Sequence, residues 1–516
     1  MARLRHRIPV RLRHHWRLVA TCVAFLAACY GVFGSGTVRP YVTSVRTASA
    51  GVVVRDLAGS KELFDAATPH EVTLTFREEG YQAMLAEYFK DGDKKYVEAD
   101  LTIDGTTIPS VGIRLKGNST LQGLTWKGQT RPRTTSGRGN PPEGFRPPGG
   151  EPPEGVQPPG DGRQEDARRR GGSGAALKAE EPENLPWLIS FDEFVEDRRY
   201  QGHSQLAVRP AMGSAAVLNE AVAIALVGAA DEPSQRSAYT SFSVNGRRSA
   251  PRLLVEYLDE GYAERLGHGV LYKSLASGDF AYQGEDQTAY VDDFKQVNLV
   301  GERDLQPVID LVRWVEQASD EEFASGLAER LDVVSFARYA ALQNIVLNFD
   351  DMAGPGHNYY LWYDLGTKRF RVISWDMNLA LRGDATAGPD DAIGMRSPGG
   401  GGDRATRPEP GEQAGQRVRP PADQQPDVRR PGGARGGGHA LKERFLEDAG
   451  FKKLYEREHA ALSRDLLAGG TATALLDQAL KAYGLNADAD TAKAAGEAAD
   501  LRATLEIRAK ALTQDG

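Results

Sequence analysis

Cysteine is almost absent from this chain of 516 residues. The two cysteines, Cys22 and Cys29, both lie near the N-terminus, in a segment that has the pattern of a membrane signal. The rest of the chain therefore has no disulfide and no thiol chemistry, even though we expect it to face the oxidising side of a membrane. Its stability must come from the burial of side chains alone.

Several other kinds of site have little support. The histidines His203, His268, His357 and His439 lack metal-ligand spacing, which argues against a zinc site. No Gly-x-Ser-x-Gly run supports a hydrolase nucleophile, and no calcium-binding-hand loop is present. A formal net charge of −8 without a basic patch argues against a nucleic-acid partner. The sequence does not exclude the paired carboxylates of a glycoside hydrolase.

The apolar run near the N-terminus is short. Leu18 to Gly34 holds 17 uncharged, mostly apolar residues, which as a helix would span roughly 26 Å, a marginal membrane crossing. The Arg-rich flank before it predicts that residues 1–36 are a signal anchor, with the remainder outside the cytoplasm. Leu26-Ala27-Ala28-Cys29 also fits a lipoprotein signal in which Cys29 carries the lipid. Both interpretations predict a membrane-attached, extracytoplasmic protein.

Glycine and proline are plentiful, at 57 and 28 residues, and two stretches concentrate them. Residues 128–184 turn to Gly, Pro, Arg and Glu, and residues 389–438 turn to Gly, Pro, Gln and Arg. Such segments have almost nothing to bury, so we expect both to be disordered insertions. The first interrupts a strand-rich region, because strand-like sequence resumes at Trp187.

Outside the insertions, strand and helix patterns follow one another. Period-two alternation and runs of β-branched or aromatic residues predict strands at 71–76, 96–103, 107–115, 187–191, 238–244, 252–257, 359–363 and 370–375. Helical spacing predicts helices at 81–89, 215–226, 304–317, 333–347, 441–467, 471–483 and 488–512. Asp104-Gly105 and Asn245-Gly246 are the turn signals of two hairpins.

The stretch from Val346 to Ala380 organises the chain. It carries acids at Asp350-Asp351 and at Asp376, separated by a predicted hairpin whose turn lies at 365–368. A predicted helix, an acidic loop with a trailing Asn, a short hairpin and then Asp is the order of parts in a protein-kinase active site. There the first Asp orients the substrate hydroxyl, and the Asn and second Asp hold Mg²⁺ on the phosphates.

A plainer interpretation of these acids is structural. Asp376 could cap a helix that begins at Met377, and Asp350 could cap a turn. Two such positions joined by a hairpin, preceded by a helix and carrying Asn358 in order, favour the active-site interpretation.

The motifs of this stretch resemble those of the CotH family of atypical kinases, which is named for a spore-coat protein. They stand as Asn348-Phe349-Asp350, His357-Asn358-Tyr359-Tyr360-Leu361-Trp362 and Trp375-Asp376-Met377-Asn378. The resemblance implies an α+β, bilobal kinase-like fold that uses ATP with Mg²⁺ or Mn²⁺. It makes Asp350 the catalytic acid and gives metal binding to Asn358 and Asp376. Asp351 directly follows and competes for the catalytic role, and Asn378 replaces the family's final acid.

The resemblance also implies cofactor-binding residues elsewhere. The run Arg114-Leu115-Lys116-Gly117-Asn118-Ser119 is similar to a small-lobe stretch of the family, in which Lys116 and the following amides could hold a polyphosphate. Its plain alternative is a strand that ends in a turn. Glu220 stands where the family has a paired acid. Glu256 falls near the expected adenine edge, although a surface acid explains it nearly as well. Lys273 matches a further family run and could touch substrate or phosphate.

One residue expected from the family is missing. The strand that matches Leu185 to Ser190 usually carries a Lys that binds phosphate oxygens and pairs with the helix acid, but this run contains no base. The cation that pairs with Glu220 would then be Lys116 or Arg209. A kinase that lacks this ion pair is slow or inactive, so the departure bears on activity more than on fold.

With the resemblance, the chain divides into seven segments. These are the N-terminal signal (1–36), small-lobe strands (37–127), the first insertion (128–184), the rest of the small lobe (185–260), the large lobe with the motifs (261–388), the second insertion (389–438) and C-terminal helices (439–516).

The favoured function is that of an atypical Ser/Thr protein kinase, anchored to a membrane, that phosphorylates envelope or coat-type proteins with Ser/Thr-rich segments. The alternative is a catalytically weak, nucleotide-binding or structural scaffold protein of the cell envelope. The missing strand Lys favours this alternative, as does an expected location where ATP is scarce.

Overall fold

The computed structural model describes residues 55–131, 177–210, 217–394 and 438–513. All of them belong to one compact unit, Val53–Gly516. The expected N-terminal signal and most of both expected insertions lie outside the described residues. Within the described residues, no helix has the length and apolar character needed to cross a membrane.

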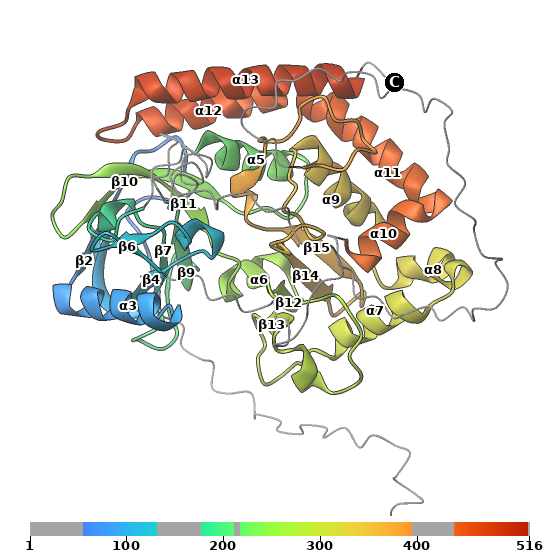
Figure 1. The fold of residues 1–516 in the computed structure, drawn as a ribbon, viewed down its shortest axis with the longest axis horizontal. Helices are drawn as coiled ribbons and strands as arrows, with labels where there is room; N and C mark the ends of the chain where they lie inside the picture. Colours follow the sequence, from blue (N-terminus) through green and yellow to red (C-terminus); the bar gives the residue numbers. More distant parts are fainter. Residues whose placement is uncertain (1–54, 132–176, 211–216, 395–437, 514–516) are drawn as a thin grey trace, which may run out of the picture. The chain divides into compact units, whose positions relative to one another are not determined.

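Seven strands form a closed barrel in the N-terminal half of the described chain (Figure 1). They are β2 (His70–Phe76), β3 (Val97–Ile103), β4 (Thr106–Leu115), β7 (Trp187–Ser190), β9 (Gln205–Val208), β10 (Ser237–Val244) and β11 (Ala250–Glu256). The order around the barrel is β10-β11-β9-β7-β4-β3-β2. All of these strands except β9 were predicted. The closure was not predicted, because it depends on a parallel pairing of β10 with β2 that sets Thr240 beside His70.

The alternating burial of side chains along β2 shows how the interior of the barrel is filled with hydrophobic residues. Val72, Leu74 and Phe76 are buried, whereas the residues between them are exposed or half-buried. Side chains on alternate positions point to opposite faces of a strand, so one face of β2 packs inward. The helix α3 (Glu78–Asp91) adds Tyr81 and Leu85 to the same hydrophobic cluster.

A second, four-stranded sheet follows in the chain, in the order β13-β12-β14-β15. Its strands are β12 (Gly269–Ser274), β13 (Phe294–Gln296), β14 (Tyr359–Asp364) and β15 (Phe370–Ser374). The helices of this region are α6 (Glu260–Leu266), α7 (Gln306–Gln317), α8 (Asp320–Gly326) and α9 (Val333–Ile345). The predicted hairpin of the central stretch is therefore confirmed as β14 and β15, paired antiparallel.

The helix α5 (Leu218–Ala229) is apolar on nearly all sides. Nine of its residues are buried, which is expected of a helix enclosed by other elements. It packs against α12 and against the turn that follows β15. Its position lets it carry Glu220 into the interior beside the central motif.

The C-terminal region is helical, as predicted, with one difference. Its elements are α10 (Ala440–Glu447), α11 (Ala449–Leu462), a π-helical turn (Ser463–Ala468), α12 (Thr471–Gly484) and α13 (Thr491–Thr513). The predicted single helix at 441–467 is interrupted at Asp448, whose carboxylate accepts hydrogen bonds from Gly450 and Phe451 and so begins α11. Figure 1 shows α12 and α13 running side by side.

The remaining strands are short pairs at the margins. They are β1 (Arg55–Leu57) with β8 (Arg198–Tyr200), and β5 (Thr125–Trp126) with β6 (Gln129–Thr130). The described residues form two large hydrophobic clusters. One lies inside the barrel, and the other lies among α5, α9, the second sheet and the C-terminal helices. The mixed α+β class predicted from the sequence is confirmed.

The contact between α6 and the turn after β8 allows a direct test of the packing. A Cβ atom on Gly261 would overlap the backbone oxygen of Gly202. We expect Gly261→Ala to lower the free energy of unfolding by about 1–3 kcal/mol, because the backbone cannot move aside cheaply. Denaturant unfolding measures this change. Gly123→Ala is the control, since nothing lies within 4 Å of its added Cβ; equal stability of the two variants would contradict this packing.

Candidate active site

The loop after α9 holds Asp350. The carboxylate of Asp350 accepts a hydrogen bond from the backbone N–H of Gly356 at 2.6 Å and one from the side-chain amide of Asn358 at 2.9 Å. A Cβ on Gly356 would lie 2.7 Å from a carboxylate oxygen of Asp350, so this close approach requires glycine. The loop thus brings together two of the predicted site residues, Asp350 and Asn358.

Asp376 follows β15 in a left-handed conformation, with φ 55° and ψ 60°. A short 3₁₀ turn, Met377–Leu379, comes next, but the side chain of Asp376 makes no capping bond to it. The helix-cap interpretation of Asp376 is therefore wrong. Leu347, before the acidic loop, also has a positive φ, of 53°. Such strained positions cluster at functional sites, where the surrounding structure holds them.

Arg209 joins Asp376 to α5. Its guanidinium forms a short ion pair with Glu220 and lies 2.8 Å from a carboxylate oxygen of Asp376. Arg209 and Glu220 are both buried. Of the two cations that the sequence left open as partners of Glu220, the structure selects Arg209, which comes from the end of β9 rather than from β7.

Two further contacts hold this ion pair in place. Arg252 of β11 is buried and donates hydrogen bonds to the backbone oxygen of Arg209. Asn219, next to Glu220, donates to the backbone oxygens of Asn378 at 2.8 Å and Ala380 at 3.0 Å. The side chain of Asn219 therefore attaches the backbone of the segment after Asp376 to α5.

Four cations gather around Tyr257, and two of them, Lys116 and Lys273, also lie close enough to act on Asp376. The four are Lys94, Arg114, Lys116 and Lys273. Lys94 donates to the side-chain oxygen of Asn118 at 2.6 Å, and Arg114 lies over the ring of Tyr96. Within the described part of the chain, none of the four forms an ion pair. Burial, together with the charges of Arg114, Lys273 and Arg131, lowers the pKa of Lys94 to about 8. Four like charges without a carboxylate partner among the described residues repel one another, and a bound anion would reduce this repulsion.

Aromatic rings arrange two of these cations. Lys116 lies 5.2 Å from the ring centre of Trp375, and Lys273 lies 5.4 Å from the same ring. Lys273 also donates to the hydroxyl of Tyr257 at 3.2 Å. Both lysines approach the residue that immediately precedes Asp376, so the phosphate-binding position predicted for Lys116 lies at the acidic motif.

Two of these cations, Arg114 and Lys273, border a cleft of about 330 Å³. Its walls also include Lys295, the aromatic residues Tyr96, Tyr257 and Tyr360, and the four acids Asp192, Glu193, Asp259 and Glu260. Tyr360 is buried, and its phenol lies close to that of Tyr257. The cleft therefore combines aromatic faces with charges of both signs.

The two central acids have opposite pKa shifts. Burial raises the pKa of Asp350, and the negative charge of nearby Asp376 adds to this rise. Burial alone would also raise the pKa of Asp376, but the charges of Arg209, Lys116 and Lys273 outweigh it and lower the pKa. Asp376 is thus an ionised carboxylate at neutral pH, whereas Asp350 has a greater affinity for a proton.

The site offers a divalent cation two oxygen donors. Among the described residues, no group of three or more His, Cys, Asp or Glu side chains is arranged to hold a metal ion. A Mg²⁺ ion bound with a nucleotide needs only one or two protein ligands, because phosphates and waters complete its shell. Asp376 offers a carboxylate. The amide nitrogen of Asn358 donates a hydrogen bond to Asp350, so the amide oxygen remains available to bind a cation.

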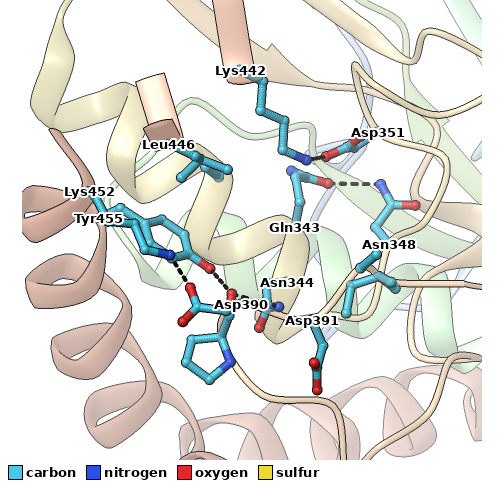
Figure 2. A pocket seen from close by; sticks show the side chains of 14 residues that line it. Gln343, Asn344, Asn348, Asp351, Asp390, Asp391, Lys442, Leu446, Lys452 and Tyr455 are labelled. Carbon is cyan, nitrogen blue, oxygen red and sulfur yellow. Dashed lines mark hydrogen bonds and ion pairs between the residues drawn. The ribbon is translucent and has the colours of Figure 1, made fainter. Parts of the chain in front are cut away.

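Asp351 faces a different environment from Asp350. Its buried carboxylate forms a short ion pair with Lys442 of α10 and accepts a hydrogen bond from Ala353. Both Asp351 and Lys442 line a cavity of about 340 Å³ behind the acidic loop (Figure 2). The structure thus separates the two candidates for the catalytic acid, and of the two carboxylates only that of Asp350 accepts a hydrogen bond from the side chain of Asn358.

Glu256 is not at the cleft. Its side chain is fully buried and forms ion pairs with Arg236 at 3.2 Å and Arg265 at 2.6 Å. Its backbone N–H donates to the oxygen of Arg236, and its backbone oxygen accepts from Gln235. Because all its polar groups are occupied, the predicted contact between Glu256 and a nucleotide base is not supported. The next residue, Tyr257, lines the cleft instead.

Several residues of the site were not predicted. Lys94, Arg114, Tyr257 and Lys442 were not singled out for the site. Arg114 lies in the same quoted run as Lys116, so the run itself carried a signal. No local signal marks Lys442, which is 91 residues from its partner Asp351.

The comparisons with known proteins agree with the resemblance seen in the motifs. The family model of the CotH kinase protein matches residues 167–484, which is more than half of the chain. No curated protein matches this chain. The matched range includes Arg209, Glu220, the acidic loop and Asp376. The chain belongs to the CotH kinase family.

Proposed function

We propose that this chain transfers the terminal phosphoryl group of ATP to a Ser or Thr hydroxyl of a protein substrate. The family implies kinase activity in general. The observation that supports this donor is the group of four unpaired cations, Lys94, Arg114, Lys116 and Lys273, beside the acidic motif. A polyphosphate is the anion that best matches several cations next to a metal-binding carboxylate.

The residues divide the work of phosphoryl transfer between them. Asp376 and Asn358 would hold Mg²⁺ or Mn²⁺, which neutralises charge on the phosphates when bound. Asp350 would orient the acceptor hydroxyl and take its proton. The raised pKa of Asp350 suits this role, because a proton acceptor works best when its pKa is nearer the working pH. Catalysis of this type depends mostly on positioning and charge.

Arg209 accounts for the missing strand lysine. In a protein kinase one lysine binds phosphate and pairs with the helix acid. Here Arg209 pairs with Glu220, and Lys116 stays free to bind phosphate. Two residues would therefore share the task that one lysine performs elsewhere, which supports an active protein despite the missing strand lysine.

The location and the substrates belong to the same proposal. The Arg-rich N-terminus and the apolar run that follows it support an extracytoplasmic domain attached to a membrane. Proteins of the envelope or coat with Ser/Thr-rich segments would then be the accessible substrates.

One observation favours the alternative, a nucleotide-binding scaffold without turnover. Arg209 already neutralises Asp376, the carboxylate that would bind the metal. If this ion pair persists when nucleotide is bound, the metal loses a ligand. Nucleotide binding without phosphate transfer in the assay below would support this alternative.

A comparison of the two adjacent acids tests the catalytic assignment. We expect Asp350→Asn to lower the rate of phosphate transfer from ATP to Ser-rich protein by at least about a hundredfold, because the amide cannot accept the proton. Its affinity for ATP should stay near that of the wild type. Asp351→Asn is the matched control and should lower the rate far less. A larger loss of rate in Asp351→Asn would reverse the assignment.

The affinity for ATP should fall as the pH rises through about 8. Burial and the charge of Arg209 lower the pKa of Lys116 to about 8, so its positive charge is present below this pH and lost above it. One charged contact to phosphate is worth roughly 1.5–3 kcal/mol, or about tenfold to a hundredfold in affinity. Calorimetric titration on either side of this pH measures the change.

Lys116→Arg and Tyr257→Phe identify the group responsible for this pH dependence. Lys116→Arg keeps its charge and should flatten the profile. The pKa of Tyr257 is also lowered to about 8, because Lys273 and Lys116 outweigh its burial. If Lys116→Arg leaves the pH dependence of ATP affinity unchanged and Tyr257→Phe flattens it, then the phenol of Tyr257 titrates and not Lys116.

A further inference from the structure

The C-terminal helix α13 carries a buried arginine toward the acidic loop. Arg508 has no exposed surface and is among the largest fully buried side chains of the described residues. It lies beyond residues 167–484, the range that matches the family model. A fully buried guanidinium needs several hydrogen-bond acceptors to offset its loss of water, so its partners indicate what the helix holds.

Those partners are carbonyl oxygens. The guanidinium donates to the backbone oxygen of Asn344 at 2.8 Å, to that of Ile345 at 3.3 Å and, in a short bond, to that of Ala387. Among the described residues Arg508 has no carboxylate within ion-pair distance. Asn344 and Ile345 form the end of α9, where the last carbonyls carry partial negative charge. Arg508 therefore caps α9 from another helix.

The two segments that Arg508 joins are the two halves of the site. Ile345 precedes the acidic loop by a few residues, and Ala387 follows Asp376 by eleven. The N–H of Leu381, between Asp376 and Ala387, also donates to Val346 at 2.7 Å. The end of α9 and the segment after Asp376 are thus connected near both acids.

The side chain of Asn344 extends the same connection. Its oxygen accepts from Arg508 at 2.5 Å and from His459 at 2.9 Å, and its nitrogen donates to the backbone oxygen of Gly388 at 3.0 Å. Tyr455 of α11 donates to the oxygen of Pro389 at 2.5 Å. In Figure 2, Asn344 and Tyr455 lie on the wall of the cavity behind the acidic loop.

We propose that Arg508 is a positioning residue, which holds the end of α9 and the segment after Asp376 in the relative placement that aligns Asp350 with Asp376. The proposal rests on the proposed phosphate transfer. It assigns a role in the reaction to a helix outside the matched family range. Arg508 does not touch the nucleotide cleft, so its loss acts on the alignment of the acids and leaves ATP binding intact.

Arg198 provides a matched control for the loss of a buried arginine. It is also buried and also serves three backbone oxygens, those of Phe191, Pro109 and Ser110. All its partners belong to the barrel and none to the acidic loop or the segment after Asp376. Arg198→Met should therefore lower stability as Arg508→Met does, without a specific effect on the reaction.

The test compares these two variants in the full chain. We expect both to lower the melting temperature. Only Arg508→Met should lower kcat, by about tenfold to a hundredfold, since small misplacements of catalytic groups have effects of this size. Its KM for ATP should stay within about twofold of the wild type, as expected when only catalytic alignment is lost. Equal kcat losses in the two variants, or an unchanged kcat in Arg508→Met, would overturn the proposal.

Arg508→Lys covers the case in which Arg508→Met does not fold. Lysine keeps the positive charge but has a single ammonium group in place of the planar guanidinium. The kcat of Arg508→Lys should therefore fall, while its KM for ATP should stay near that of the wild type. A wild-type kcat in Arg508→Lys would overturn the proposal.

Hydrogen exchange separates this proposal from the proposed function. If the wild type transfers no phosphate, the proposed function fails, but the connection can still be measured. Arg508→Met should speed exchange of the Leu381 N–H by about tenfold or more, which corresponds to roughly 1.4 kcal/mol of lost protection. Arg198→Met should not change it. Unchanged exchange at Leu381 in Arg508→Met would show that Arg508 does not hold this segment.

Discussion

The buried guanidinium of Arg209 connects the parts of the site. It lies between Glu220 of α5 and Asp376 after β15, and its own backbone is held by Arg252 of β11. Removing one member of such a buried ionic group leaves an uncompensated charge, which is far more costly than an exposed pair is worth. The barrel, α5 and the acidic motif must therefore keep one mutual arrangement for this group to remain paired.

Other cations of the site have different contacts from those of Arg209. Arg209 pairs with Glu220, and among the described residues Lys116 and Lys273 form no ion pair and lie near the ring of Trp375. Cation–π contacts stabilise such charges only modestly, and burial lowers the pKa of Lys116 toward 8. The cations are thus placed at some cost in stability, which an anionic ligand would offset on binding.

Much of the site followed from the sequence, because its signals are local. Asp350, Asn358 and Asp376 stand in order around a hairpin, and runs of aromatic and β-branched residues are enough to locate β14 and β15. Contacts between distant segments did not follow. The burial of Glu256 depends on Arg236 and Arg265, and the ion pair of Asp351 depends on Lys442, which lies beyond the second insertion. No periodicity encodes these pairings, and the same holds for the parallel contact between β10 and β2 that closes the barrel.

The central claim is that ATP with Mg²⁺ binds at the unpaired cations beside Asp376. Thermal unfolding of the full chain, with and without ATP and Mg²⁺, tests it most directly. Ligand at a hundred times its dissociation constant stabilises a fold by about 2.7 kcal/mol, a clear shift in melting temperature. The account predicts this shift for the wild type and its loss in Lys116→Met. A wild type that does not respond, or a Lys116→Met variant that responds equally, would contradict it.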